Sequence, residues 1–404
     1  MKILLICQYY APEPFRVSDL CEEMVRRGHE VMVVTGEPNY PEGEIYPGYE
    51  NHAKSDEVKE GVRIHRCPII PRKTGALYRM LNYYSYANKA SKYVKSKACA
   101  PKDGGKFDVV LVYQLSPVMM AKAGIAYGKK HGVPVVMYCL DLWPESIVVG
   151  GIDRKSAIFR HFHRVSGRIY TKMDRILITS RMFKEYLQQE FGVRDGVVEY
   201  LPQYAEGIFE NVPARVPEET INVMFAGNIG AAQSVDTILK AAQMLTDAPV
   251  KFHIVGGGSE LRRLKQIAEE KKLENVTFYG RQPLSEMPGF YGMADVMLVT
   301  LNSDPVLSRT LPGKVQSYMA VGKPIIGAIN GETEKVIRAA QCGFCGPAED
   351  AAALAENIRC FMAMEHKEVL GKNAKAYYDE KFEEEKFMDK LENELKRYQA
   401  GAAE

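Results

Sequence analysis

Short runs of apolar residues alternate with amphipathic segments along most of the chain. The series opens with KILLIC (2–7), a helical pattern over 16–28 that ends at Gly28, and EVMVVT (30–35), which together predict a β-α-β unit. Strands that are apolar at nearly every position are typical of a parallel sheet covered on both faces. The pattern therefore predicts a doubly wound α/β domain, and its further strands are expected at 62–65, 108–113, 133–139, 175–179 and 197–201.

A second series of the same kind begins near residue 221. Residues 202–219 separate the two series, lack a clear period and hold three prolines, so we expect the hinge there. The chain is thus predicted to be an α/β protein with two doubly wound, Rossmann-like domains, 1–201 and 202–375, and a helical tail. Strands of the second domain are expected at 221–227, 250–256, 276–280, 295–301 and 323–329.

The amino-acid composition excludes several classes of protein. The 404 residues are 46% hydrophobic and 26% charged, which excludes a disordered, collagenous or coiled-coil chain. The 53 Lys and Arg against 51 Asp and Glu exclude the basic footprint of a nucleic-acid binder. No apolar run reaches the roughly 18 residues that span a bilayer, and MKILLICQYY lacks a leader pattern, so we expect a cytoplasmic protein. Eight scattered cysteines suggest reduced thiols, and the C-x-x-C of Cys342 and Cys345 lacks further ligands for zinc.

The segment GNIGAAQS (227–234) follows the first strand of the second domain and could bind an anion. Gly227 and Gly230 allow the backbone to approach a ligand closely, and the free N–H groups of the helix that follows can bind phosphate. A tight turn without any ligand would have the same pattern. Local sequence leaves both interpretations open.

The segment DPVLSRTLPGKVQSYMAVGKP (304–324) carries a second candidate. Pro312 is expected to be the first helical residue and Gly322 the end of the helix. Lys314 then lies in the first helical turn, where the helix dipole disfavours a cation by roughly 0.3 to 1 kcal/mol and a bound anion would reverse that penalty. Arg309 could add a forked contact to the same anion. The alternative for both side chains is solvated surface charge.

The segment CLDLWPES follows the strand expected at 133–139. Asp141 and Glu145 place two carboxylates at a strand end, where a general base or an acceptor for sugar hydroxyls would be useful. Helix capping by Asp141 or Ser146, with Trp143 packed in a core, explains the same residues.

Two further features concern surfaces and metals. Helix 76–97 carries Arg79, Lys89, Lys92, Lys95 and Lys97; such a basic amphipathic helix can lie on an anionic membrane, although a core helix with a solvated face is the favoured interpretation. No D-x-D occurs, so the charge of a leaving diphosphate would have to be met by backbone N–H groups and cations rather than by a carboxylate-bound metal.

Seven segments together resemble glycosyltransferase family 4, and within it the bacterial subgroup similar to N-acetylfucosamine transferases of capsule and O-antigen synthesis. They run in family order through nearly the whole chain: YYAPEPFRVSDL, RRGHEVMVVTGEPNYPEGEIYPGY, DLWPES, FAGNIGAAQ, HIVGGGSE, LPGKVQSYMAVGKPI and CGFCGPAED. The resemblance implies the GT-B architecture, in which two Rossmann-like domains face a cleft. It also implies a retaining, metal-independent transfer, with the last helix, within 376–404, crossing back to the first domain.

The resemblance also implies roles for individual residues. Lys314 would neutralise the donor diphosphate and act catalytically, and Asp141 and Glu145 would act near the acceptor. The acceptor side would further include Glu13, Phe15, Arg16 and Trp143. The donor would be bound by Gly227, Asn228, Gly230, Gln233, Arg281, Arg309, Lys314, Ser317, Glu332 and Glu334.

The chain departs from the family pattern at the donor and in the first loop. Arg309 and Ser317 stand where many members carry two glutamates spaced eight apart, which leaves Glu332 or Glu334 as substitutes at the ribose. Gln233 lies near the position of a family lysine, and Pro14 and Phe15 replace paired glycines.

The expected activity is transfer of a sugar, an N-acetylated hexosamine or deoxyhexosamine, from a nucleoside-diphosphate donor, UDP being the expected nucleotide. The acceptor would be a lipid-linked or oligosaccharide molecule of surface polysaccharide synthesis at the inner membrane face, and no metal or other cofactor and no nucleic acid is expected. Two alternatives stay open: an epimerase of the same fold that acts on the nucleotide sugar, and a nucleotide-sugar-binding subunit without catalysis.

Overall fold

The computed structural model describes residues 1–73, 75–149, 151–209, 212 and 219–398. By internal contacts the chain divides into two compact units. The first comprises residues 1–179, 183–201 and 388–404, and the second comprises 180–182 and 202–387. Much of the hinge expected at 202–219, and the end of the tail beyond residue 398, lie outside the described residues.

The first unit is built on an eight-stranded sheet that is parallel except for one edge strand, β3, which pairs antiparallel with β4. Its spatial order is β3 (Asp56–Lys59), β4 (Val62–Cys67), β2 (Glu30–Gly36), β1 (Lys2–Ile6), β5 (Val109–Gln114), β6 (Val135–Cys139), β7 (Arg175–Ile178) and β8 (Val198–Tyr200). The chain runs outward from β1 in one direction and, from β5 onward, in the other. The order therefore reverses between β1 and β5, where the carboxyl ends of the strands form a typical ligand-binding position.

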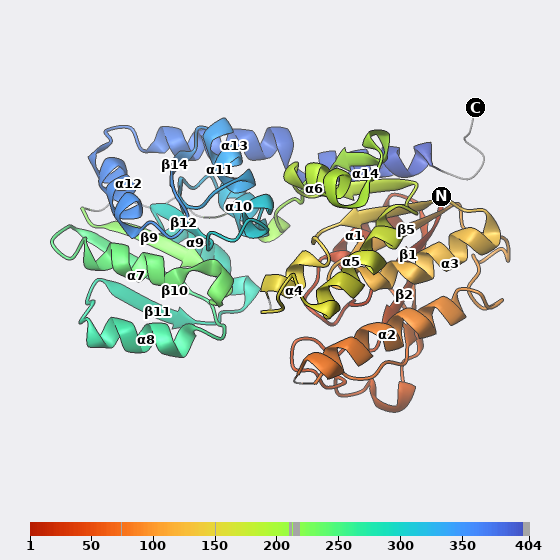
Figure 1. Cartoon of the computed structure of the whole chain (residues 1–404). Helices are drawn as coiled ribbons and strands as arrows, with labels where there is room; N and C mark the ends of the chain where they lie inside the picture. The colour runs from red at the N-terminus through yellow and green to blue at the C-terminus, as the bar shows by residue number, and fades with distance from the viewer. Residues whose placement is uncertain (74, 150, 210–211, 213–218, 399–404) are drawn as a thin grey trace. The chain divides into compact units, whose positions relative to one another are not determined.

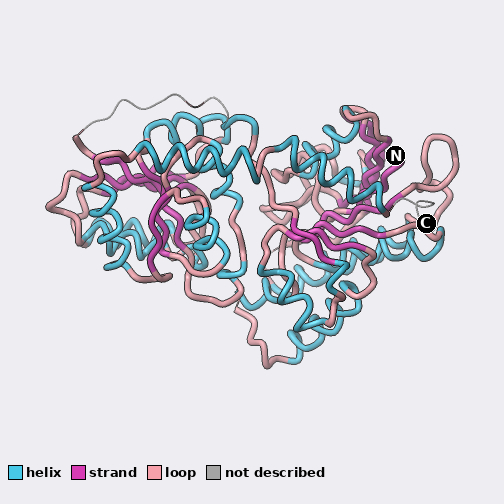
Figure 2. The backbone as a smooth tube through the Cα atoms, turned by 90° about the horizontal axis from the view of Figure 1, so that it is seen from above, coloured by secondary structure: helices cyan, strands magenta, loops and turns pink. Residues whose placement is uncertain are grey.

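Helices cover both faces of this sheet, as Figures 1 and 2 show. One face packs Leu4, Ile6, Val110 and Val112 against α2, α3, α5 and α6. Because successive strand residues point to opposite faces, Ile3 and Leu5 are buried on the other side, where α1 contacts β2. The helices are α1 (Val17–Arg26), α2 (Ala76–Tyr93), α3 (Ala121–His131), α4 (Glu145–Val149), α5 (Ala157–Tyr170) and α6 (Met182–Phe191).

The second unit has a six-stranded, wholly parallel sheet. Its order is β11 (Val276–Gly280), β10 (Val250–Val255), β9 (Ile221–Ala226), β12 (Val296–Thr300), β13 (Ile325–Ala328) and β14 (Gly343–Gly346), so the reversal lies between β9 and β12. Successive side chains of β9 again point to opposite faces of the sheet. Met224 and Ala226 pack with α10 on one face, and Val223 and Phe225 pack with α7 on the other. Its helices are α7 (Val235–Gln243), α8 (Leu261–Glu270), α9 (Met287–Met293), α10 (Gly313–Ala320), α11 (Glu332–Ala339), α12 (Ala351–Ala363) and α13 (Glu368–Lys381).

Four details differ from the sequence-based expectation. Strands β3 and β14 were not expected: DEVK is largely exposed at a sheet edge, and GFCG carries two glycines, so neither has an apolar run. Helix α10 begins at Gly313, and Pro312 is its N-cap in an extended conformation rather than its first residue. Helix α2 ends at Tyr93 instead of 97.

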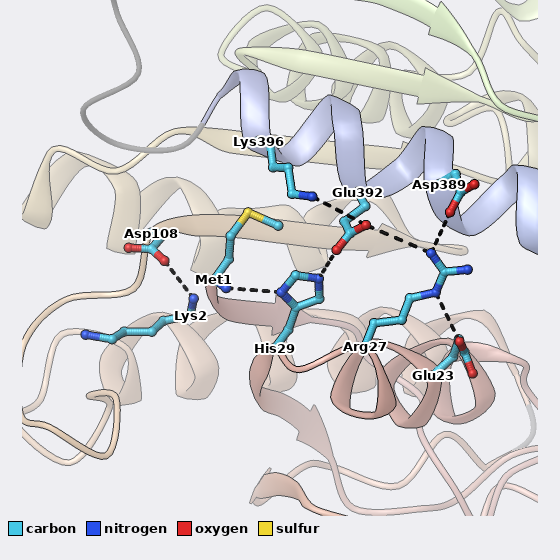
Figure 3. Close-up of polar contacts among 9 residues, drawn as sticks. All are labelled: Met1, Lys2, Glu23, Arg27, His29, Asp108, Asp389, Glu392 and Lys396. Carbon is cyan, nitrogen blue, oxygen red and sulfur yellow. Dashed lines mark hydrogen bonds and ion pairs between the residues drawn. The ribbon is translucent and has the colours of Figure 1, made fainter.

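Helix α14 (Glu384–Arg397) supplies part of the first unit from the far end of the chain. Figure 3 shows Arg27 and His29, which follow α1, reaching α14: Arg27 Nη1 lies 2.7 Å from an Asp389 oxygen, and His29 Nε2 lies 2.5 Å from Glu392 Oε1. The buried Glu394 accepts a hydrogen bond of 2.7 Å from Nε of Arg175 on β7. The outer layer of the first unit is therefore completed by residues 388–397.

Candidate functional site

In open α/β sheets ligands bind beyond the carboxyl ends of the strands, at the point where the strand order reverses. In the second unit this point is formed by the segments after β9 and β12. The two segments are joined directly, because Thr300 Oγ1 donates to the Gln233 carbonyl at 2.6 Å and the Asn302 N–H donates to the Ala232 carbonyl at 2.9 Å. The predicted glycine turn therefore stands at the reversal of this sheet.

Two glycine turns pack backbone against backbone at this edge. The turn after β9 starts at Gly227 (φ +148°), and the turn after β10 contains Gly256 (φ +146°) and Gly258 (φ +155°), all in conformations that favour glycine. A Cβ on Gly256 would lie 1.8 Å from the Gly227 oxygen, and one on Gly258 would lie 2.3 Å from the Ile229 oxygen. Sequence reasoning gave the second turn no role, although three consecutive glycines after a strand were the available signal.

Lys314 is the most unusual group of this edge. It is the second residue of α10, and its stem lies on the first glycine turn: a Cβ on Gly227 would be 2.6 Å from Lys314 Nζ and 3.0 Å from Cε. The Nζ atom is buried and has no hydrogen-bond partner among the described residues, and it sits 3.9 Å from the centre of the Phe225 ring. Burial lowers the pKa of Lys314 to about 7. A buried cation without a partner is costly, and a bound anion would satisfy it.

Two of the other predicted donor-binding residues near this edge, Gln233 and Ser317, form hydrogen bonds within the protein. The Gln233 side chain accepts from the Gly230 N–H at 3.3 Å and from Asn228 Nδ2 at 3.2 Å, so it shapes the turn. Ser317 Oγ lies 3.3 Å from Glu206 Oε2, which brings a carboxylate to the position where the family pattern carries a glutamate. Arg281, after β11, is exposed and lies against Gly257 of the second glycine turn.

Glu332 and Glu334, the two glutamates predicted to contact the ribose in place of the family's residues, lie in different environments. Glu332 is buried, and its Oε1 accepts from the Arg181 N–H at 3.1 Å. Glu334 pairs with Arg338 one helical turn along α11, at 2.9 Å. The loop bearing Arg309 packs on the same region, because a Cβ on Gly331 would lie 2.0 Å from the Ser308 oxygen. The structure thus gathers Glu332 and Arg309 near the start of α11 and directs Glu334 toward a helix-surface ion pair.

In the first unit Asp141 follows β6, next to the strand at which the order reverses. Its Oδ2 accepts a hydrogen bond from Ser116 Oγ; that hydroxyl in turn lies 3.1 Å from Ser146 Oγ and accepts from Trp143 Nε1 at 2.7 Å. Burial raises the pKa of Asp141, and the hydrogen bond from Ser116 opposes the rise. Asp141 lies four residues before the short helix α4, and its carboxylate also accepts hydrogen bonds from the hydroxyl of Ser146, in the first turn of that helix, and from the Leu142 N–H, which oppose the rise of its pKa as well.

Glu145 and Trp143 are both buried and have partners within the first unit. Oε2 of the buried Glu145 accepts two hydrogen bonds from Arg154, at 3.0 and 2.6 Å, and Oε1 accepts one from the Tyr186 hydroxyl at 3.0 Å. Trp143 is buried and packs edge-on against Phe162, with ring centroids 5.0 Å apart. The Trp143 indole N–H thus reaches Asp141 through Ser116, and Glu145 ties α4 to the loop before α5 and to α6.

The loop after β1 is also internally fixed. The buried Glu13 accepts from the N–H groups of Asn39, Tyr40 and Tyr10, at 2.9, 2.8 and 3.2 Å, and burial raises its pKa to about 7 against those hydrogen bonds. Phe15 stacks on Tyr9 with centroids 5.2 Å apart. Arg16 immediately precedes α1. Glu13 thus joins this loop to the loop after β2.

Among the described residues, no group of three or more His, Cys, Asp or Glu side chains could hold a metal ion. Within those residues, too, no helix is both long and apolar enough to cross a bilayer. Metal independence stays a prediction that requires an assay.

Two family models match consecutive parts of the chain. Residues 15–203 match the glycosyl transferase 4-like domain, and residues 209–377 match glycosyl transferases group 1. A protein of Escherichia coli (strain K12) named as a colanic acid biosynthesis glycosyl transferase, WcaI, is 26% identical over 347 residues, which cover 80% of this chain and 82% of that protein.

Solved structures share the fold over nearly the whole length. Sucrose-phosphate synthase from Thermosynechococcus elongatus superposes with a TM-score of 0.75 at 18% identity, covering 98% of both chains. Anabaena HepE in complex with UDP and glucose gives a TM-score of 0.69 at 15% identity, covering 98% of this chain and 99% of that one. These likenesses confirm the predicted fold class, GT-B with two Rossmann-like units.

Proposed function

We propose that this chain, a glycosyltransferase built from a glycosyl transferase 4-like domain and a glycosyl transferases group 1 domain, moves a sugar from a nucleoside-diphosphate donor to an acceptor in surface polysaccharide synthesis. The supporting relative is named for colanic acid biosynthesis, and HepE has been solved with UDP. UDP is therefore the donor nucleotide that we propose.

The observation that carries the proposal is the unpartnered ammonium of Lys314. It lies against Gly227, at the strand-order reversal of the second unit, and it is buried beside the first turn of α10. A diphosphate would supply the missing acceptors, and N–H groups of the glycine turn and of α10 can share its charge. We propose that Gly227, Asn228 and Gly230 bind the diphosphate and that Lys314 stabilises it as it leaves.

On the acceptor side we propose Asp141 as the group that orients and deprotonates the attacking hydroxyl. The bond from the anomeric carbon to the diphosphate oxygen breaks, the bond from that carbon to the acceptor oxygen forms, and the hydroxyl proton passes to the carboxylate. Ser116 holds that carboxylate, and burial raises its pKa, which makes it a better base than an exposed aspartate. We further propose that transfer proceeds with retention and without a metal.

This chain lacks the two glutamates with which many family members contact the donor, and we assign the ribose contact to nearby carboxylates instead. Glu332 follows Gly331, which packs on the Ser308 carbonyl next to Arg309, and Glu206 lies 3.3 Å from the Ser317 hydroxyl, so each replaced position has a carboxylate nearby. The sugar proposed is an N-acetylated hexosamine or deoxyhexosamine, in keeping with the resemblance to N-acetylfucosamine transferases. The acceptor proposed is a lipid-linked saccharide reached at the inner membrane face, with α2 as the membrane contact.

The test combines nucleotide-sugar binding with product analysis. We expect UDP and one UDP-sugar to raise the Tm of the protein, because a ligand that binds only the folded state stabilises it. Lys314→Met should abolish most of that rise, and Lys265→Met, an exposed lysine on α8 of the same unit, should leave it intact. Donors that stabilise the protein are then incubated with membrane extracts that contain acceptor.

The products distinguish the proposal from its alternatives. Free UDP together with a glycosylated acceptor supports transfer. An isomeric nucleotide sugar without free UDP would instead show an epimerase. Binding without any product, across the donors and acceptors that bind, would show a nucleotide-sugar-binding subunit.

A further inference from the structure

Two glutamines lie at the carboxyl edge of the first sheet, at the same level of neighbouring strands. In the parallel pairing of β1 with β5, Ile6 stands opposite Val112, and Gln8 and Gln114 follow these residues by two positions. The chain past β1 still pairs with β2, because the Gly36 N–H donates to the Gln8 carbonyl at 3.1 Å. The two glutamines therefore stand at the ends of the two strands between which the strand order reverses.

Both side chains take the place of core residues. Because successive strand residues point to opposite faces, Gln8 continues the row of Leu4 and Ile6, and Gln114 continues the corresponding row of β5. Leu4 and Ile6 belong to the core on the α2 side of the sheet. Gln8 and Gln114 are each 0% exposed. Two amides are thus buried where aliphatic side chains would pack without any hydrogen-bonding requirement.

The contacts of Gln114 determine which of its atoms lacks a partner. Its Nε2 donates to the carbonyl of Leu115 at 2.8 Å and to the carbonyl of Asp141 at 3.1 Å. Carbonyl oxygens only accept hydrogen bonds, so the NH₂ group has to face them. The Oε1 atom is left over, buried and without a hydrogen-bond partner among the described residues.

Gln8 is oriented by a chain of amides that ends in the same way. Its Nε2 donates to Asn82 Oδ1 at 2.7 Å. Asn82 Nδ2 itself donates to the Ile70 carbonyl at 2.7 Å and to Asn39 Oδ1 at 3.3 Å, so Asn82 Oδ1 has to be an acceptor. Gln8 Oε1 is therefore also an acceptor that is buried and has no partner in the described part of the chain.

The two amide oxygens require donors, and their surroundings specify the kind. A buried acceptor without a partner costs free energy until a donor reaches it. The pKa of the neighbouring Asp141 is raised by burial and lowered by three hydrogen bonds, and no cation of the described residues is among the groups that act on it. A phosphate next to this carboxylate and two amide oxygens would be repelled, whereas a hydroxyl group can donate to them.

We propose that Gln8 and Gln114 bind two hydroxyl groups of a neutral sugar on the acceptor. The first unit then recognises the sugar residue that receives the new bond rather than the phosphate of a lipid carrier, and Asp141 acts on a hydroxyl of the same sugar. The inference rests on the proposed function and deepens it, because it names the part of the acceptor that is recognised and the residues that recognise it.

The test measures binding of two sets of probes to the full chain by ligand-observed saturation-transfer NMR. One set comprises methyl glycosides of neutral hexoses, N-acetylhexosamines and deoxyhexoses. The other comprises farnesyl phosphate and farnesyl diphosphate, which carry the phosphates of a lipid carrier and no sugar. We expect at least one glycoside to bind at millimolar concentration.

Two variants replace an amide by an apolar chain of similar length. Gln8→Met and Gln114→Met should each weaken glycoside binding by about 5- to 10-fold and leave the Kd for UDP unchanged, which also confirms that the variants fold. Asn275→Leu is the matched control. The Oδ1 of Asn275 is likewise buried without a partner within the described ranges, but it lies just before β11 in the second unit, so glycoside binding should not change.

Three results would overturn the inference. Unchanged glycoside binding in either Met variant would show that its amide holds an internal water instead of a ligand. Binding of farnesyl phosphate that depends on the two glutamines would show a phosphate site. Failure of every glycoside to bind, while membrane extracts still release UDP from the donor, would refute the sugar site and leave the proposed function intact; absence of UDP release would count against the proposed function itself.

Discussion

Binding of UDP should take up a proton at Lys314. The perturbation is pH, because the pKa of the buried amine is about 7 in the ligand-free protein and the ordinary value is 10.5. At pH 8 a group with that lowered pKa is about one-tenth protonated. If the diphosphate restores the ordinary pKa, each bound UDP brings about 0.9 proton with it at this pH.

The same shift gives the affinity a defined pH dependence. Between pH 7 and pH 9 the protonated fraction of the free amine falls from about one-half to about one-hundredth, so the Kd for UDP should weaken by roughly 50-fold, or ~2.3 kcal/mol. The phosphates of UDP are already ionised across this range. Their own titration therefore adds little to the change.

Isothermal titration calorimetry in two buffers of different ionisation enthalpy measures the proton uptake directly. The uptake should disappear in Lys314→Met and persist in Lys265→Met. An uptake below about 0.2 proton at pH 8, or one that survives in Lys314→Met, would refute the assignment of Lys314 to the diphosphate.

In the ligand-free protein the buried Lys314 amine affects the folding stability, and its contribution becomes more favourable as the pH rises. Between about pH 7 and 10.5 the unfolded chain holds a proton on this lysine that the folded chain has released, so folding stability contributed by this group rises with pH. Lys314→Met retains the apolar stem and removes the charge. It should raise the Tm of the ligand-free protein at pH 7 while weakening UDP binding.

Four further outcomes are expected. Gly256→Ala should abolish UDP binding and lower the Tm, because its Cβ would lie 1.8 Å from the Gly227 oxygen; a normal Kd would mean that the two glycine turns are independent. Asp141→Asn should leave the Kd for UDP unchanged and reduce kcat by about 10² to 10⁴, and near-normal kcat would remove it from the reaction. Glu145→Gln should lower the Tm, since it weakens the double hydrogen bond from Arg154, with little effect on kcat per folded enzyme; a large fall in kcat at normal Tm would give this carboxylate a catalytic role. Transfer should continue in EDTA, and loss with recovery on adding Mg²⁺ or Mn²⁺ would contradict the metal-free mechanism.

The sequence predicts the sheets well because most of their strands are buried on both faces. Twelve apolar runs were predicted to be strands and all twelve are strands, whereas the two strands that were not predicted, β3 and β14, have no apolar run. Such edge strands form because a neighbouring strand offers unpaired backbone groups, as β4 does for Asp56–Lys59. That information resides in the tertiary structure rather than in the local sequence.

The candidate site is predicted less completely, because residue type does not reveal a side chain's partners. Lys314 and Gly227 were expected at one anion site, and the structure does bring them together. Glu145 was expected to be available to an acceptor, but both of its oxygens are occupied by residues 9 and 41 positions away. Only three-dimensional contacts distinguish a carboxylate that is free for chemistry from one that holds two segments together.

The outer helix α14 has a consequence for synthesis of the chain on the ribosome. Arg27, His29 and Arg175 find acidic partners on Asp389, Glu392 and Glu394, and Leu391 and Leu395 are fully buried. The N-terminal half therefore emerges from the exit tunnel long before its last covering helix has been translated. In a fragment ending at residue 201, Arg27, His29 and Arg175 lack the partners that α14 supplies, and the apolar surface that Leu391 and Leu395 cover is exposed. Complete closure of the first unit must therefore await a segment that is made almost 200 residues after residue 201.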